Sequence, residues 1–391
     1  MTVVSPQFRQ FLLLALAGTL AAALKLSVLD GSAFGPGFES VNVARSLAAG
    51  NGFADPYSAL ATGPTAHTAP VYPYLLSIGI RLLGFGGAFA AVCMSFNLIF
   101  QGIQAALLPG LSAVLLGDRV PGLWAAGLLI ALPLIPLTAQ GETDLQILAL
   151  MLCTLIPVAG WSAAPAALLA ALALHLNPSS LLLLPGWLVW KRPPRRWLLV
   201  WGFTLAAAML PWTIRNYQTF GGIFFIRDNL GLELRVSNND LAGASAKGNG
   251  ASLAALHPMF NTEEARALIR ASEPAYMAEC GRQASDWIRA HPSAFARFTL
   301  IRAALYWFPA INDGHWQAWL LTLITILSLG GILRVWKHPV FFFGFAVAPL
   351  LYYLLQADPR YRYPYFWLTL LVAGAFLHRV YGRLRRKPEP S

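Results

Sequence analysis

Charged residues are scarce in this sequence. Only 12% of the 391 residues are charged, whereas 57% are hydrophobic, and the mean hydropathy is +0.56. Soluble domains carry about 25% charged residues, so these proportions exclude a single water-soluble domain and a disordered chain. Cysteine is scarce too: Cys93, Cys153 and Cys280 are too few and too scattered for a disulfide framework or a cysteine metal cage.

A glycine-rich phosphate loop of the nucleotide-binding kind is also missing, which disfavours a nucleotide-binding site of that kind. The net charge of +11 does not indicate nucleic acid as a partner. The basic residues cluster in short loops between apolar runs, the pattern that sets orientation in a lipid bilayer. The sequence therefore predicts a membrane protein.

The apolar runs predict the fold class: an all-α polytopic membrane protein with about ten transmembrane helices. The first run lacks a convincing cleavage site and is expected to remain as a helix. Three of the runs are short for a full crossing. The predicted spans are residues 11–29, 88–108, 120–138, 145–158, 163–176, 179–190, 197–212, 316–335, 340–355 and 366–380.

Lysine and arginine set the predicted orientation. Ten spans place the basic stretches at 191–196, 334–337 and 383–387 on one side, and the positive-inside rule makes that side the cytoplasm. Both termini are then cytoplasmic, and the short basic loops suit a bacterial inner membrane. Residues 30–87 and 213–315 face outward, as periplasmic loops that form a small extramembrane layer.

Three parts follow from this topology. A transmembrane module covers residues 1–212 and includes the first outward loop, a periplasmic subdomain covers 213–315, and the last helices with a basic tail cover 316–391. Within the subdomain we expect helices at 262–270 and 274–290, with Asn261 or Thr262 as a cap. Alternating residues at 222–226 and 232–236 are compatible with an extended strand.

The first outward loop carries a short helix with one polar face. Glu39 lies at its start, and a glycine-rich stop follows at residues 50–52. An apolar stretch at 72–84 is expected to form an interfacial helix. Two plainer interpretations stay open here: Glu39 could be a surface acid paired with Arg45, and His67 could be an ordinary loop residue.

Several short motifs, in this order, resemble bacterial members of the GT-C superfamily of integral-membrane glycosyltransferases, such as protein O-mannosyltransferases and aminoarabinose transferases. Each motif is short, and the signal lies in their order along a polytopic chain. They are the acid Glu39, then ARSLAAGNGF at 44–53, PTAHTAPVYP at 64–73, LPWTIRNY at 210–217 with FG at 220–221, NLGLEL at 229–234, HP at 291–292 and RYRYP at 360–364.

The resemblance implies a catalytic acid in the first outward loop, which here is Glu39. In the superfamily this acid often belongs to an Asp-Glu pair, whereas here Ser40 follows it. A single carboxylate weakens any metal role, so no metal and no cofactor are expected, and Glu39 is left as the general base. The second acidic position of the family corresponds to Glu142 or Asp144, with Glu142 favoured.

The resemblance also implies binding residues. Arginines outside run against the positive-inside bias, so Arg362, Arg360 and Arg215 are candidates for the donor phosphate, and Arg362 is favoured. The alternative for each is an interfacial anchor. Further candidates for binding substrate are His67, Tyr72, Asn238, Asn239 and Glu233.

The function implied is an inverting glycosyl transfer from a polyprenyl-phosphate-linked sugar to an acceptor hydroxyl at the outer face of the membrane. The acceptor class, whether protein, glycolipid or polysaccharide, stays open. A different class of function is a non-enzymatic flippase or transporter for lipid-linked sugars, although transporters usually show repeated halves. An inactive relative with the same fold is a third interpretation.

Overall fold

A computed structural model describes residues 5–28, 39–134, 141–156, 162–312 and 314–385. Within these ranges the secondary structure is helical, with two isolated β-bridges and no strand. Parts of the predicted spans at 11–29, 120–138 and 145–158, the start of the first outward loop and the end of the basic tail lie outside the described residues.

Four described helices are long and apolar enough to cross a membrane. They are α1 (Pro6–Val28), α4 (Gly87–Leu116), α9 (Arg195–Phe220) and α15 (Trp316–Val335). Shorter apolar helices are α3 (Val71–Leu83), α5 (Val120–Ala131) and α7 (Ala163–Leu176), beside α6 (Glu142–Leu155) and the long α18 (Tyr363–Arg385). The chain is thus a helical, membrane-embedded protein, while the count of ten spans stays a prediction.

Small residues bring α1 and α4 close together. A Cβ atom on Gly18 would lie 2.8 Å from the Cα of Gly102, and one on Gly102 would collide with the backbone of Ala15. Such small-residue contacts are a common way for membrane helices to associate, because apolar burial gives little driving force in lipid. The α1–α4 pair is therefore specified by its glycines.

Two predicted spans are interrupted. Residues 179–190 form the 3₁₀ turn η2 (Pro178–Leu182) and α8 (Leu184–Lys191), and residues 340–355 form α16 (Pro339–Phe342), the π-helical turn η4 (Phe343–Val347) and α17 (Leu350–Leu354). Pro349 has no backbone N–H to continue the helical ladder, so the second break has a local cause. Residues 179–190 thus form two short pieces, whereas Pro339–Leu354 is one apolar helix with a π-helical turn inside it.

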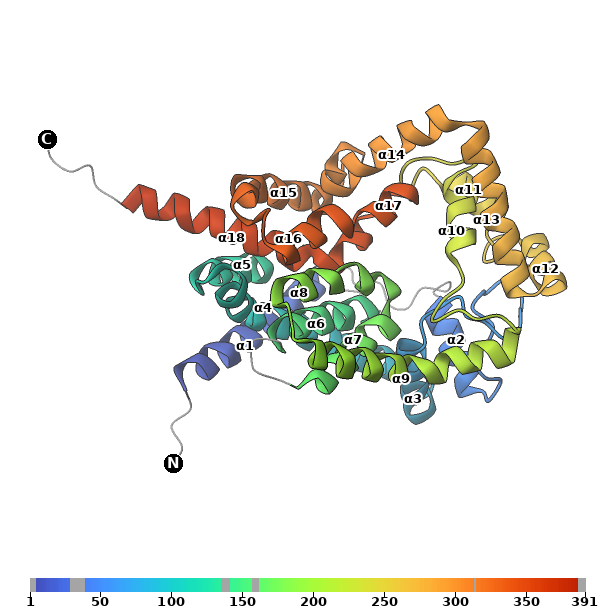
Figure 1. Ribbon diagram of the computed structural model, residues 1–391, viewed down its shortest axis with the longest axis horizontal. Helices are drawn as coiled ribbons and strands as arrows, with labels where there is room; N and C mark the ends of the chain where they lie inside the picture. The colour runs from blue at the N-terminus through green and yellow to red at the C-terminus, as the bar shows by residue number, and fades with distance from the viewer. Residues whose placement is uncertain (1–4, 29–38, 135–140, 157–161, 313, 386–391) are drawn as a thin grey trace, which may run out of the picture.

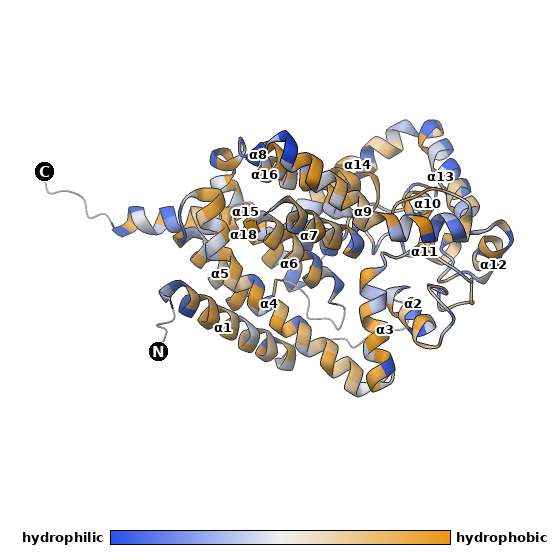
Figure 2. Ribbon diagram, turned by 60° about the horizontal axis from the view of Figure 1, so that its bottom comes forward, coloured by the Kyte–Doolittle hydropathy of each residue, from blue (hydrophilic) through white to orange (hydrophobic). Residues whose placement is uncertain are grey.

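The segments predicted to face outward form a helical layer. Figure 1 shows α2 and α10–α13 at the end of the molecule opposite the two termini, and Figure 2 shows many hydrophilic residues on α13, whereas α4 is mostly hydrophobic. The layer consists of α2 (Glu39–Ala48), α10 (Leu230–Ser237), α11 (Gly250–Leu256), α12 (Thr262–Ala271), α13 (Glu273–Ala290) and α14 (Pro292–Trp307), followed by η3 (Pro309–Ile311) and, later, η5 (Pro359–Arg362).

Two predictions for this layer are confirmed and one is wrong. Helices α12 and α13 lie where they were expected, and the side chain of Asn261 caps α12 by accepting from the amides of Glu263 and Glu264. The predicted strand at 232–236 is part of helix α10. Its alternating pattern also places Leu232 and Val236 four residues apart, and both are buried on one face of the helix.

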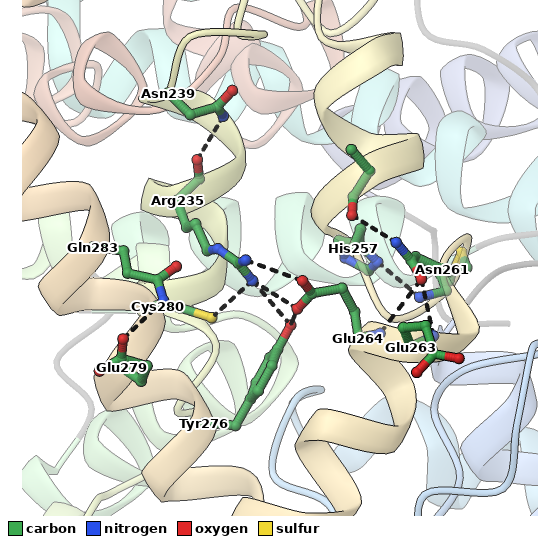
Figure 3. Close-up of polar contacts among 12 residues, drawn as sticks. Arg235, Asn239, His257, Asn261, Glu263, Glu264, Tyr276, Glu279, Cys280 and Gln283 are labelled. Carbon is green, nitrogen blue, oxygen red and sulfur yellow. Dashed lines mark hydrogen bonds and ion pairs between the residues drawn. The ribbon is translucent and has the colours of Figure 1, made fainter.

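An ion-pair cluster ties the layer together. Arg235 on α10 donates to both carboxylate oxygens of Glu264 on α12, at 2.7 and 3.0 Å, and Tyr276 on α13 donates to the same carboxylate at 2.6 Å (Figure 3). Bidentate guanidinium–carboxylate pairs are strong and directional. The cluster therefore fixes three helices relative to one another.

Candidate functional site

A polar pocket lies where the first outward loop, the start of α6 and the segments before α10 and α18 meet. It has a volume of about 230 Å³, and we call it the carboxylate pocket. The residues that line it and carry the chemistry are Glu39, Ser40, His67, Tyr72, Glu142, Arg227, Glu233 and Arg360. Three acids and two guanidinium groups from distant parts of the chain therefore share one cavity.

Glu39 opens helix α2, where the partial positive charge of the helix start favours a carboxylate. Its Oε1 lies 3.8 Å from Nε2 of His67. Burial would raise its pKa, but the nearby imidazoles of His67 and His257 lower the pKa of Glu39 to about 2. Pairing with Arg45 was wrong, since Arg45 packs over the ring of Phe85 at 4.8 Å.

The side chain of His67 is held by a hydrogen bond, so it is not an ordinary loop residue. Its side chain is buried, and its Nδ1 lies 3.0 Å from the hydroxyl of Tyr57. If Nε2–H faces the Glu39 carboxylate, Nδ1 must accept the proton of the tyrosine hydroxyl. Tyr57, His67 and Glu39 then form a chain that orients the carboxylate.

Glu142 opens α6, ahead of that helix's apolar stretch. Its Oε2 accepts a hydrogen bond from Ser40 at 3.1 Å, so the two acidic segments are joined through a hydroxyl. Burial raises the pKa of Glu142 to about 7, because the opposing effects of Arg227 and Ser40 are smaller. A carboxyl group with this pKa can exchange a proton at neutral pH.

The second acid of α6 lies elsewhere. Asp144 is buried away from the carboxylate pocket, and its Oδ1 accepts from Nε2 of Gln104 at 2.8 Å. The helical turn between Glu142 and Asp144 sends the two side chains in different directions. Of the two predicted alternatives, the structure brings only Glu142 to Glu39.

Two arginines contribute positive charge to the carboxylate pocket. Arg360 lines it from η5, with its Nε 3.4 Å from Asp358 and more than half of its side chain exposed. Arg227 lines it from the loop before α10, and its Nε donates to the backbone carbonyl of His67 at 2.7 Å. Sequence reasoning missed Arg227, although it too is an arginine in an outward region.

The other predicted phosphate ligands do not line this pocket. Arg362 is 2% exposed, donates to the carbonyl of Trp307 at 3.2 Å and lies between the rings of Trp307 and Phe366. Arg215 donates to the carbonyls of Thr65 and Phe53, at 2.7 and 3.0 Å. The guanidinium of Arg215 therefore holds the chain, whereas Nε and Nη2 of the buried Arg362 have no hydrogen-bond partner among the described residues.

Some of the predicted substrate-binding residues line the carboxylate pocket, and others do not. His67 and Tyr72 line the carboxylate pocket, as does Glu233. Asn238 instead donates to the carbonyls of Leu234 and Leu354, at 3.0 and 3.1 Å. Asn239 donates to the last carbonyls of α10 and to Ser252, so the asparagine pair ends a helix and does not reach the pocket.

An apolar groove of about 270 Å³ adjoins the pocket between α3 and α4. It is lined by residues such as Leu76, Phe89 and Phe96, and it shares Tyr72 with the carboxylate pocket. The hydroxyl of Tyr72 accepts from the amide of Gly141 at 2.7 Å, next to Glu142. A ligand that crosses Tyr72 would meet polar groups on one side and hydrocarbon on the other.

Glu39, His67 and His257 are the described residues that could hold a metal ion, with donor atoms within 4.8 Å of one another. Nitrogen and carboxylate donors suit zinc. However, Nδ1 of His257 accepts from the amide of Met259 at 3.1 Å, so the neutral ring carries its proton on Nε2. This hydrogen bonding fits an ionised carboxylate between two imidazoles better than a metal cage.

Comparisons with models of protein families, with curated proteins and with solved structures gave no match. The interpretation of the site therefore depends on its geometry. That geometry combines a proton-exchanging acid, an ionised acid, two cations and an adjoining apolar groove in one place.

Proposed function

We propose that the chain is an inverting glycosyltransferase that moves a sugar from a polyprenyl-phosphate donor to an acceptor hydroxyl. The observation that carries the proposal is the shared cavity of Glu39, Glu142, Arg227 and Arg360. A transfer of this class needs a carboxylate to take a proton and cations to meet the charge on a departing phosphate. The resemblance to the GT-C superfamily supports the same reaction.

Glu142 takes the proton in this proposal. The acceptor oxygen forms a bond to the anomeric carbon from the face opposite the phosphate, and its proton passes to the Glu142 carboxylate. The bond from the anomeric carbon to the phosphate oxygen breaks, and its electron pair stays on that oxygen. A base works best with a pKa near the working pH, and the value of about 7 favours Glu142.

Glu39 serves in its ionised form. With a pKa near 2 it is a weak base, so the role expected from the sequence passes to Glu142. An anion held beside the reacting sugar stabilises the positive charge that builds up on the anomeric carbon during transfer. Tyr57 orients His67 through a hydrogen bond, and the imidazole of His67 lies 3.8 Å from this carboxylate.

Arg227 and Arg360 are assigned to the phosphate. Arg227 is held at its Nε by the carbonyl of His67, which leaves its terminal nitrogens for a ligand. Arg360 is the more exposed of the two and lies beside Tyr361. Two guanidinium groups compensate the charge of the lipid phosphate as it leaves.

The apolar groove between α3 and α4 is assigned to the first isoprene units of the donor. Tyr72 lines both the groove and the carboxylate pocket, so the apolar groove and the polar groups lie on either side of one residue. This arrangement supports a lipid-linked donor over a soluble one. We propose that the site faces the periplasm, with both termini cytoplasmic in a bacterial inner membrane, as the basic loops predict.

The test is turnover of a donor panel by the purified full-length protein in lipid nanodiscs. Each polyprenyl-phosphate sugar is incubated with candidate acceptors, and release of the free lipid phosphate is measured. We expect release with at least one donor and inversion at the anomeric carbon. Passage of intact carrier across a reconstituted bilayer without cleavage would contradict the proposal and favour the flippase interpretation.

A further inference from the structure

A second cavity lies where α7, α8 and α9 meet. It has a volume of about 230 Å³ and shares no lining residue with the carboxylate pocket or the apolar groove. We call it the tryptophan pocket, because its walls include Trp187 from α8 and Trp197 and Trp201 from α9. Nothing in the proposed glycosyl transfer uses it.

The walls of the tryptophan pocket suit a hydrocarbon chain. Ala166 and Ala170 of α7 form one side, and their small side chains leave the space open. Trp197 and Trp201 form the other side, with their rings stacked at 13° and their centroids 6.3 Å apart. Both sides are apolar, and they belong to helices of a membrane-embedded protein.

Trp187 lies inside the protein behind this wall. Its side chain is 6% exposed, and its indole Nε1 has almost no accessible surface, so a ligand in the pocket would meet the apolar part of the ring.

The mouth of the pocket is basic. Lys191, Pro193 and Pro194 line it, and the segment from 191 to 196 carries four cations with no acidic residue. Arg192, Arg195 and Arg196 are exposed. In Figure 2 the dark blue of hydrophilic residues lies close to the label of α8. Positive charge beside an apolar cavity matches the two ends of an anionic lipid.

We propose that the tryptophan pocket binds an anionic phospholipid. One acyl chain enters between the alanines of α7 and the tryptophans of α9. The headgroup phosphate lies against the cations of the 191–196 segment. Tryptophans at a membrane interface usually act as anchors in the headgroup region, but a Trp187 that is almost fully buried cannot do so.

The first experiment measures lipid retention by native mass spectrometry. Full-length protein is exchanged from detergent against equal amounts of phosphatidylglycerol and phosphatidylcholine, and bound lipid is counted per chain. We expect each chain to retain one phosphatidylglycerol molecule in clear preference to phosphatidylcholine. Ala170→Phe, which fills the cavity, should abolish that retention, whereas Leu168→Phe, on an exposed position of the same helix, should leave it unchanged. Retention by Ala170→Phe at the wild-type level would overturn the proposal.

A second pair of variants separates binding from folding, in case Ala170→Phe is poorly folded. Removing two exposed charges with Arg195→Gln and Arg196→Gln should weaken phosphatidylglycerol binding roughly thirtyfold and leave phosphatidylcholine unaffected. Equal binding of both lipids by the wild type, or displacement of the lipid by inorganic phosphate alone, would contradict an acyl-chain site.

Discussion

Two buried glutamates show how differently this chain treats the same side chain. Glu264 receives two hydrogen bonds from the guanidinium of Arg235 and one from Tyr276, and these contacts lower its pKa although burial would raise it. Glu142 receives a hydrogen bond from Ser40, and burial raises its pKa to about 7. The first glutamate is locked as an anion, whereas the second exchanges protons near neutrality.

The difference lies in where the positive charge is placed. In the α10–α12–α13 cluster the cation contacts the acid directly, so neither has capacity left for a ligand. In the carboxylate pocket, Arg227 is tied to a backbone carbonyl and Arg360 to Asp358, so both stay apart from Glu142. A cavity with separated charges can bind a charged substrate, and a closed ion pair holds helices.

The largest expected effect comes from Glu142→Gln. The amide can still accept from Ser40, so the fold should be kept, but it cannot take a proton. We expect the rate of sugar transfer to fall roughly a hundredfold to ten-thousandfold. Release of lipid phosphate measures the rate. Glu279→Gln, on the exposed face of α13, is the matched control, and an unchanged rate in Glu142→Gln would remove the proposed mechanism.

The next largest effects should come from substituting Arg360 and Arg362, and the two substitutions should affect different properties. Arg360→Gln removes a cation from the carboxylate pocket and should lower transfer by about tenfold to a hundredfold, with an unchanged melting temperature. Arg362→Gln removes a buried group that contacts Trp307 and Phe366, so it should lower the melting temperature first. Activity assays and thermal unfolding are needed for both, and the reverse pattern would contradict the assignment.

Glu264→Gln should give the smallest effect on chemistry. Losing the charged hydrogen bonds to Arg235 should destabilise the helical layer by about 1.5–3 kcal/mol. The carboxylate pocket does not include Glu264, so the transfer rate measured below the unfolding temperature should stay near the wild type. A loss of activity without a loss of stability would mean that the two regions are coupled.

Local patterns in the sequence predicted much of the helical framework. Glycine stops, Asn261 as a cap and long apolar runs act within a few residues, so α2, α3, α12 and α13 lie close to where they were expected. The strand assigned to 232–236 was wrong because five alternating residues also fit a helix whose buried face holds Leu232 and Val236. Tertiary packing decides between those two interpretations.

The carboxylate pocket was only partly predictable. Glu39 and Glu142 stand out because both are acids at the starts of helices in outward loops. Arg227 could not be chosen from the sequence, since its place beside His67 depends on a contact across 160 residues. The sequence favoured Arg362 over Arg360, because only the folded chain shows that Arg362 packs against two aromatic rings.

The pH dependence of transfer tests the central claim most directly. Glu142 accepts a proton only when it is ionised, so kcat/KM should rise with pH and reach half its maximum near pH 7, where its pKa lies. In the Glu39→Gln variant, kcat/KM should show the same rise with pH but at lower values throughout. A profile that is flat through pH 7 and falls only toward the pKa of Glu39, near 2, would contradict the account and return the base to Glu39.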